Sequence, residues 1–171
     1  EKVGIFGHSG GGFMSTSALL TYPDFYSAAV SSAGNHDNNI YNRGWVEIYN
    51  GVQESTKTIQ TATGKDSIIY TFSSHVPTNM ELAKNLKGHL LLVSGDQDRN
   101  VHPAHLLRMA NALIQANKNF EMLLIPGAKH GYTGQANRFF EKKLWFHFAK
   151  YLLGDFSSEQ FTDLDETLKI K

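Results

Sequence analysis

The feature that most constrains this chain is a strand, a sharp turn and a helix placed directly one after another near its amino end. The apolar run Val3–Phe6 leads at once into Gly-His-Ser-Gly-Gly at residues 7–11, and a helical pattern covers Phe13–Leu20. A G-x-S-x-G turn between a strand and a helix lifts the serine hydroxyl above the edge of a sheet, and its glycines leave room for the tight crossing. Ser9 is therefore the first candidate nucleophile.

The composition excludes several classes of function. The 171 residues carry 16 basic and 16 acidic side chains, with no basic tract that would neutralise phosphates or hold an anionic membrane. Nucleic acid is thus not an expected partner. The chain has no cysteine, which excludes disulfides, thiolate catalysis and cysteine zinc sites. No apolar run approaches the roughly 20 residues of a membrane span, and neither a cofactor nor a metal is expected.

Short apolar runs alternate with amphipathic stretches, which is typical of β-α units around a parallel sheet buried on both faces. One helix is predicted to begin near Pro103 and end around Asn117, and a last helix runs from about Asn137 to Leu153 before Gly154 stops it. The predicted class is α/β, with about four parallel strands flanked by helices. The predicted strands are Val3–Phe6, Ala28–Ser31, Leu90–Ser94 and Met122–Ile125.

A long polar stretch, Gly34–Asn79, separates the second and third predicted strands. Loops of this length are usually functional or disordered. A short hairpin around Gly64 and Lys65 is expected inside it, because Thr56–Thr61 and Ile68–Phe72 favour strand. A short helix is predicted just beyond it, at Met80–Leu86.

Two later loops offer the partners that a nucleophilic serine needs. A base must remove its proton, and an acceptor must fix the tautomer of that base. The third strand leads into a loop with two carboxylates, Asp96 and Asp98, and the fourth leads into a glycine-flanked loop with His130. The order Ser, Asp, His along the chain is that of the α/β-hydrolases.

The other histidines are assigned structural roles. His147 is expected to pack inside the last helix, and His8 to pack or hydrogen-bond locally within the turn. His102 and His105 are expected to cap a helix and to be solvated, since no third ligand accompanies them at a usable spacing. The pair at residues 36 and 37 is interpreted as part of a loop turn rather than as a pair of metal ligands.

Taken together, three motifs resemble the catalytic domain of the prolyl oligopeptidase family, and in particular its dipeptidyl peptidase IV branch. They are residues 7–11, the loop Gly95–His102 and the segment Lys129–Tyr132. The similarity extends from Lys2 to Gly154 and is weakest over Gln53–His75. It implies an α/β-hydrolase fold in which residues 1–154 form the C-terminal part of the catalytic domain and residues 155–171 form a C-terminal tail.

The resemblance also implies roles for individual residues. In the family the acid lies just before the short stretch leading to Val-His, which is Asp98 here, while Asp96 shapes the turn. The backbone N–H of Gly10 would donate to the oxyanion, although a tyrosine often stands at this position in dipeptidyl peptidase IV. Asn100 would help to hold a substrate carbonyl.

Two aromatic residues are candidates for the pocket that takes the residue before the scissile bond. They are Tyr41 and Trp45, in a stretch whose spacing departs from that of the family.

The expected function is that of a serine peptidase, with Ser9, Asp98 and His130 cleaving peptide bonds through an acyl-enzyme. In the full-length protein it would be a dipeptidyl peptidase IV-like aminopeptidase acting on peptides, periplasmic or secreted by resemblance. Family members also carry an N-terminal β-propeller, upstream catalytic-domain strands and a second oxyanion donor, all expected outside this chain. The isolated 171 residues are therefore expected to be feeble or inactive, and an open sheet edge beside the first strand makes a homo-oligomer possible.

Two alternatives stay open at this point. The same triad cleaves esters, so the protein could be a carboxylesterase or an acyl-peptide hydrolase. A non-catalytic binding module could also retain the triad residues without activity.

Overall fold

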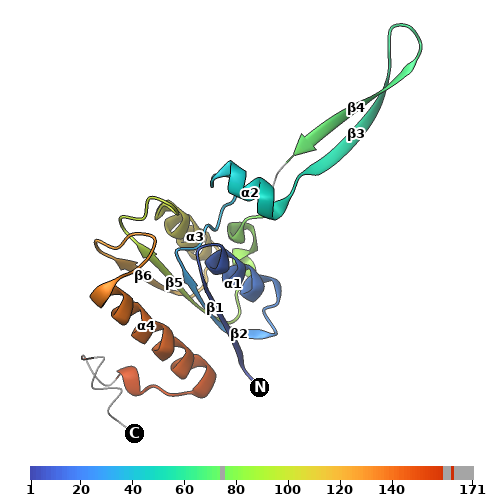
Figure 1. The fold of residues 1–171 in the computed structure, drawn as a ribbon. Coiled ribbons are helices and arrows are strands. Elements are labelled where there is room, and N and C mark those ends of the chain that lie inside the picture. Colours follow the sequence, from blue (N-terminus) through green and yellow to red (C-terminus); the bar gives the residue numbers. More distant parts are fainter. Residues whose placement is uncertain (74–75, 160–162, 164–171) are drawn as a thin grey trace. The chain divides into compact units, whose positions relative to one another are not determined.

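The computed structural model describes residues 1–73, 76–159 and 163. They form two compact units, of which one comprises Glu1–His36 with Asn79–Lys171 and the other Asp37–Thr78 (Figure 1). Of the predicted tail at 155–171, the described residues are 155–159 and 163, and they include a short 3-10 helix at Ser157–Glu159.

The first unit is built on a four-stranded parallel sheet in the order β1-β2-β5-β6. The four predicted strands are confirmed, and each is longer than its apolar run. The strands extend beyond their apolar runs because polar residues also join the hydrogen-bonded pairing. For example, His8 at the end of β1 pairs with Ser32 at the end of β2. The strands are β1 (Val3–His8), β2 (Tyr26–Ser32), β5 (His89–Gly95) and β6 (Glu121–Ile125).

The central strands β2 and β5 are buried over almost their whole length, as continuous apolar runs in a parallel sheet should be. On one face, Leu90 and Leu92 of β5 pack under helices α1 (Gly10–Thr21) and α3 (Ala104–Gln115), together with the 3-10 helix η1 (Asn79–Asn85).

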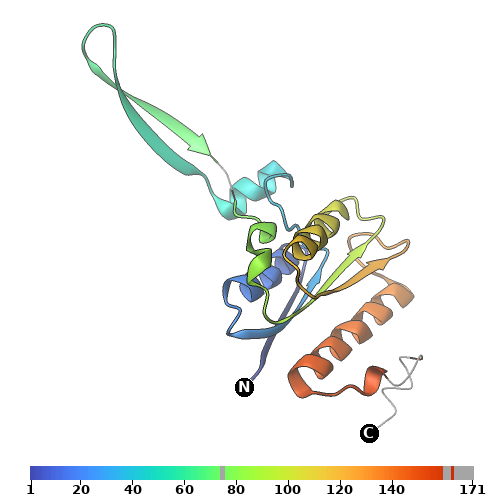
Figure 2. The ribbon, with the colours of Figure 1, turned by 180° about the vertical axis from the view of Figure 1, so that it is seen from behind.

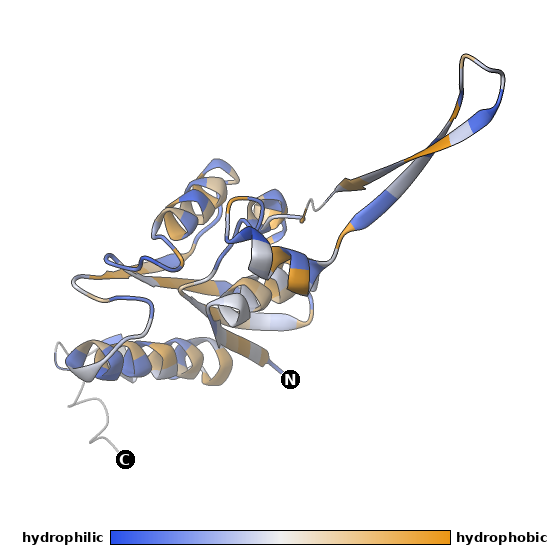
Figure 3. Ribbon diagram, turned by 45° about the horizontal axis from the view of Figure 1, so that its top comes forward, coloured by the Kyte–Doolittle hydropathy of each residue, from blue (hydrophilic) through white to orange (hydrophobic). Residues whose placement is uncertain are grey.

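Helix α4 (Gly134–Phe148) lies on the other face of the sheet (Figure 2). Leu91 and Val93 of β5 pack against Leu144 of this helix. Hydrophilic and hydrophobic residues alternate along α4, as expected of a helix with one buried side (Figure 3). The sheet is therefore covered on both faces, which confirms the predicted α/β class.

The predicted helices exist with shifted ends. Pro103 is the N-cap of α3 rather than its first helical residue, and the helix ends at Gln115. The last predicted helix divides into α4 and a π-helical turn, η2 (Ala149–Leu153). Gly154 ends it in a left-handed conformation with φ 75°, as glycine allows.

The second unit corrects the expectation of one long polar loop. It contains a helix, α2 (Arg43–Asn50), whose first turn is capped by the Asn42 side chain accepting a hydrogen bond from the Trp45 amide at 3.0 Å. The predicted hairpin is present and longer than expected, as β3 (Gln53–Gln60) and β4 (Asp66–Ser73) in antiparallel register.

Candidate active site

Ser9 stands at a strained turn between β1 and α1. Its backbone has φ 59° and ψ −123°, a conformation that is costly for a residue with a side chain. The chain can turn so sharply because Gly7 lies against Gly11, where a Cβ on Gly7 would come within 2.3 Å of the Gly11 carbonyl oxygen. The Ser9 amide donates to the carbonyl of Ser32 at 2.8 Å, which fixes the turn against the end of β2.

Asp98 lies on the loop after β5 and is buried. One carboxylate oxygen, Oδ1, accepts hydrogen bonds from the amides of Asn100 and Val101, each at 2.9 Å. The other oxygen, Oδ2, lies 2.8 Å from Nδ1 of His130. The loop backbone therefore holds the carboxylate in place and leaves one oxygen free to orient the histidine.

His130 lies on the loop between β6 and α4, with its side chain one quarter exposed. Its Nε2 is 3.0 Å from the Ser9 hydroxyl oxygen, so Ser9, His130 and Asp98 form one continuous chain of hydrogen bonds. Residues far apart in the sequence meet here because the carboxyl ends of parallel strands share one edge of the sheet. These distances fit the spacing of a nucleophile, its base and the group that orients the base.

The turn that begins the His130 loop is fixed by the preceding loop. Asp96 accepts a hydrogen bond from the Gly127 amide at 2.6 Å, so this carboxylate shapes the turn, as the resemblance implies. The approach is close at Gly95 too, where a Cβ would meet the Ala128 carbonyl oxygen at 2.2 Å.

The remaining predicted site residues fall in different places. Gly10 is the first residue of α1, so its N–H is among those without an acceptor inside the helix. Asn100 lines a pocket of about 740 Å³ beside His130, together with Arg99 and Lys129.

Tyr41 and Trp45 belong to the second unit, where their rings meet edge to face with centroids 5.5 Å apart. Their part in the substrate pocket stays a prediction.

Three further residues adjoin the site that sequence reasoning did not assign to it. His8 is hydrogen-bonded through Nδ1 to the Ser32 hydroxyl at 3.0 Å, and the Ser32 hydroxyl is hydrogen-bonded to that of Tyr132 at 3.0 Å. The local hydrogen bonding expected of His8 is present. The signal that could have found the group is proximity, since His8 precedes Ser9 and Tyr132 follows His130 by two residues.

Other histidines have structural roles. His147 is buried in α4 with its ring near Glu121, which agrees with the packing role expected for it. His102 caps α3 by accepting from the Ala104 amide at 3.1 Å. His105 is buried rather than solvated, because it shares a face of α3 with Met109.

His36 lies in the loop after β2 and is buried. Its Nδ1 is hydrogen-bonded to the Asn79 side chain at 3.0 Å, and Asn79 also donates to the Phe13 carbonyl. The Asn79 amide in turn donates to the His36 carbonyl at 3.1 Å. Burial, together with a smaller effect of His105, lowers the pKa of His36 to about 3, so its ring is neutral.

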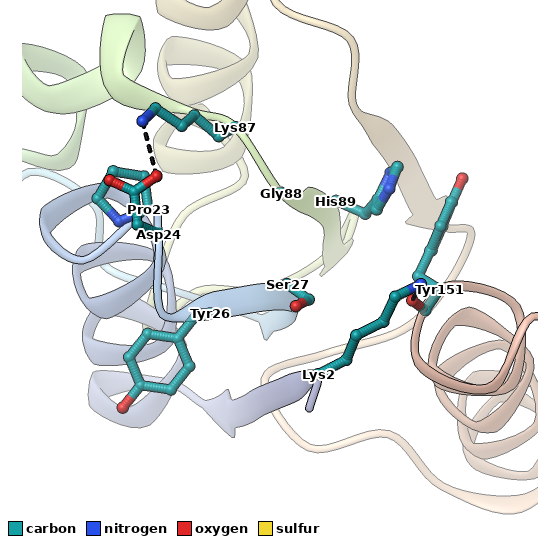
Figure 4. Close-up of a pocket in the computed structure, with 9 residues that line it drawn as sticks. All are labelled: Lys2, Pro23, Asp24, Tyr26, Ser27, Lys87, Gly88, His89 and Tyr151. Atoms are coloured by element: carbon teal, nitrogen blue, oxygen red, sulfur yellow. Dashed lines mark hydrogen bonds and ion pairs between the residues drawn. The ribbon is translucent and has the colours of Figure 1, made fainter.

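A second pocket, of about 320 Å³, lies around the amino ends of β2 and β5, at the opposite end of the sheet from Ser9. Figure 4 shows Lys87 directed toward Asp24, with which it forms an exposed ion pair, and Lys2 directed toward Tyr151. The pocket is therefore separate from the candidate site.

A serine on a strained turn between a strand and a helix, followed along the chain by an aspartate and a histidine on loops after later parallel strands, defines an α/β-hydrolase fold. Residues 1–156 match the model of the prolyl oligopeptidase family, and the chain belongs to this family.

Named relatives agree with this assignment. The chain is 30% identical to human (Homo sapiens) dipeptidyl peptidase 8 over 130 residues, which are 76% of this chain and 13% of that protein. It is 25% identical to bovine (Bos taurus) prolyl endopeptidase FAP over 157 residues, 92% of this chain and 19% of the relative.

Solved structures show the same fold. A putative dipeptidyl aminopeptidase IV from Bacteroides ovatus superposes with a TM-score of 0.70 at 24% identity, covering 86% of this chain and 19% of that one. Dipeptidyl peptidase 4 from Porphyromonas gingivalis superposes with a TM-score of 0.66 at 26% identity, covering 85% of this chain and 19% of that one. The expected likeness to the dipeptidyl peptidase IV branch is confirmed, and the chain spans less than a fifth of the length of these four proteins.

Family membership supports a peptidase of the serine type. Within the described residues, no helix combines the length and the apolar content that crossing a membrane requires.

Proposed function

We propose that Ser9, His130 and Asp98 are the catalytic triad of a serine peptidase that cleaves peptide bonds in the full-length protein. The observation that carries the proposal is the chain of two contacts, 3.0 Å from Ser9 Oγ to His130 Nε2 and 2.8 Å from His130 Nδ1 to Asp98 Oδ2. Membership of the prolyl oligopeptidase family supports it.

In the first half of the reaction, the Ser9 Oγ forms a bond to the carbonyl carbon of the scissile peptide while its proton passes to His130 Nε2. Asp98 holds the His130 ring in the tautomer that can accept this proton and stabilises the imidazolium that results. The tetrahedral intermediate then collapses, the C–N bond breaks, and His130 gives its proton to the leaving amine.

The charge on the tetrahedral oxygen needs a donor. The Gly10 N–H supplies one, beside the nucleophile at the positive end of α1. In the second half a water molecule, deprotonated by His130, attacks the acyl-enzyme. The acid product leaves, and the proton returns to Ser9.

The substrate class follows from the relatives. The names dipeptidyl peptidase 8 and dipeptidyl peptidase 4 support removal of dipeptides from peptide substrates by the full-length protein. Asn100, in the pocket beside His130, would hold a substrate carbonyl, and Tyr41 and Trp45 would contact the residue before the scissile bond.

The test is covalent labelling of the full-length protein with a fluorophosphonate, followed by peptide mapping. Ser9 should be labelled, and Ser9→Ala should abolish labelling, whereas the matched control Ser17→Ala, in the helix that follows Ser9, should leave it intact. An unlabelled wild-type protein would mean a non-catalytic binding module.

A second assay separates peptidase from esterase. The full-length protein should hydrolyse a proline-containing dipeptide amide, and Ser9→Ala should lose this activity. Turnover of a short-chain ester without turnover of the dipeptide amide would instead favour the carboxylesterase or acyl-peptide hydrolase alternative.

A further inference from the structure

His8, Ser32 and Tyr132 come from three different elements and meet beside His130. His8 is the last residue of β1 and Ser32 the last of β2, and the two pair in register. The Ser32 hydroxyl lies 3.0 Å from His8 Nδ1 and 3.0 Å from the Tyr132 hydroxyl, so it joins β1 to the loop between β6 and α4.

His8 contacts His130 through its ring. The two rings lie with centroids 4.8 Å apart and planes inclined by 51°. Tyr132 packs edge-on to His8 with centroids 5.8 Å apart. The His130 ring therefore has Asp98 at one nitrogen, Ser9 at the other, and the His8 ring against it.

The loop that carries His130 needs such support. It has glycine at residues 127 and 131, and Gly127 adopts φ 72°. Asp96 fixes the start of the loop through the Gly127 amide. Tyr132 lies on the far side of His130, so the contacts through Ser32 and His8 fix the other end.

The charges around His8 favour its neutral form. The titratable groups that face it are His130 and Tyr132 from the β6–α4 loop and Asp98 from the loop after β5. Burial lowers the pKa of His8 and the neighbouring His130 lowers it further, against smaller opposing effects of Asp98 and of the His130 backbone. Burial also raises the pKa of Tyr132 to about 12. Because the pKa of His8 is lowered, a neutral ring adjoins His130 when His130 becomes an imidazolium.

We infer that His8 is a positioning residue for the proposed reaction: its ring, joined through the Ser32 hydroxyl to Tyr132, packs against His130 and holds it in line between Asp98 and Ser9. The inference rests on the proposed serine peptidase function. It concerns the orientation of the base and not contact with the substrate.

The experiment uses the full-length protein and a proline-containing dipeptide anilide. His8→Ala should lower kcat by about 10- to 100-fold, because a small displacement of a catalytic group costs this much. KM should stay within about threefold of the wild-type value, because His8 orients the base and binds no substrate. Tyr132→Phe removes only the terminal hydroxyl and should lower kcat by about 3- to 10-fold, with KM again within about threefold of the wild-type value.

A proton NMR readout is independent of turnover. The proton shared by Asp98 and His130 should resonate downfield of the amide region in the wild-type protein, and it should broaden or shift in His8→Ala. The matched control is His89→Ala, a histidine at the opposite end of the sheet, which should preserve both this resonance and kcat.

An unchanged resonance together with a kcat within about twofold of wild type in His8→Ala would overturn the inference. If His8→Ala does not fold, Tyr132→Phe decides by the same criterion. A wild-type protein that is neither labelled at Ser9 nor active would contradict the proposed function instead. The resonance of the proton shared by Asp98 and His130 would still report whether His8 orients His130.

Discussion

Replacing Asp98 by asparagine gives the sharpest test of the candidate site. In the wild-type protein Oδ1 accepts from two amides, of Asn100 and Val101. An asparagine must keep its oxygen there, because its nitrogen cannot accept a hydrogen bond. The amide nitrogen therefore replaces Oδ2 and donates to His130 Nδ1. His130 then carries its proton on Nε2 and cannot accept the one from Ser9.

The size of the effect follows from this wrong tautomer. Substituting amide for carboxylate in a Ser-His-Asp triad lowers kcat by roughly 10⁴-fold with little change in geometry. At about 1.36 kcal/mol for each factor of ten, this is a loss of about 5.5 kcal/mol of transition-state stabilisation. Both backbone hydrogen bonds to the side chain survive in Asp98→Asn, so the protein should still fold.

The assay measures kcat of the full-length protein on a dipeptide anilide, with the rate of fluorophosphonate labelling as a second readout. Asp96→Asn is the matched comparison, since its side-chain oxygen can still accept from Gly127, and it should lose less than about tenfold. A kcat of Asp98→Asn within about tenfold of wild type, or a larger loss in Asp96→Asn, would refute the reasoning.

Three further predictions concern the turn, the pH dependence and the isolated chain. Gly7→Ala should destabilise the full-length protein by about 1 to 3 kcal/mol in denaturant unfolding, because the added Cβ would lie 2.3 Å from the Gly11 carbonyl oxygen. It should also slow labelling of Ser9. The control Gly44→Ala should change neither the stability nor the labelling rate. The pKa of Glu121 is lowered from 4.5 to about 2, chiefly by the neighbouring His147 ring, whose Nδ1 lies 3.7 Å from a Glu121 carboxylate oxygen. This contribution to stability is complete above pH 4.5 and is lost as the pH falls through 2. The melting temperatures of the wild-type protein and of Glu121→Gln should therefore converge as the pH is lowered over that range. A difference in melting temperature that stays constant with pH would contradict the prediction. Residues 1–171 expressed alone should turn over the dipeptide anilide at least about a hundredfold more slowly than the full-length protein, because lack of one oxyanion donor alone costs that much; equal rates would show that the site is complete within this chain.

The sequence allowed the main elements of the site to be predicted because each carries a local signal. The glycines at 7 and 11 mark the turn at Ser9, and the apolar runs before Asp98 and His130 mark the strands that carry them. Parallel strands then bring the three loops to one edge without further information. Helix α2 was missed because it is only eight residues long, has a glycine in its first turn and stands inside a stretch rich in Asn, Thr and Ser, although Asn42 and Gly51 mark its ends.

Contacts that depend on tertiary packing could not be predicted in this way. Nothing near His36 in the sequence indicates that Asn79 will hydrogen-bond to it. The joining of His8 to Tyr132 through Ser32 likewise needs the register of β1 with β2, which residue patterns do not specify. A local pattern identifies what a loop carries, whereas the support of that loop comes from the folded sheet.

The hydrogen bonds between His36 and Asn79 have a consequence for how this chain could vary. They bring the two ends of the intervening 37–78 excursion together while β2 and β5 pair directly beside them. Lengthening a loop whose ends are already joined costs little free energy, since each doubling adds only about 0.6 kcal/mol. Residues 37–78 can therefore be shortened, extended or replaced by another segment without changing the distance in space between the Ser9 and Asp98 side chains.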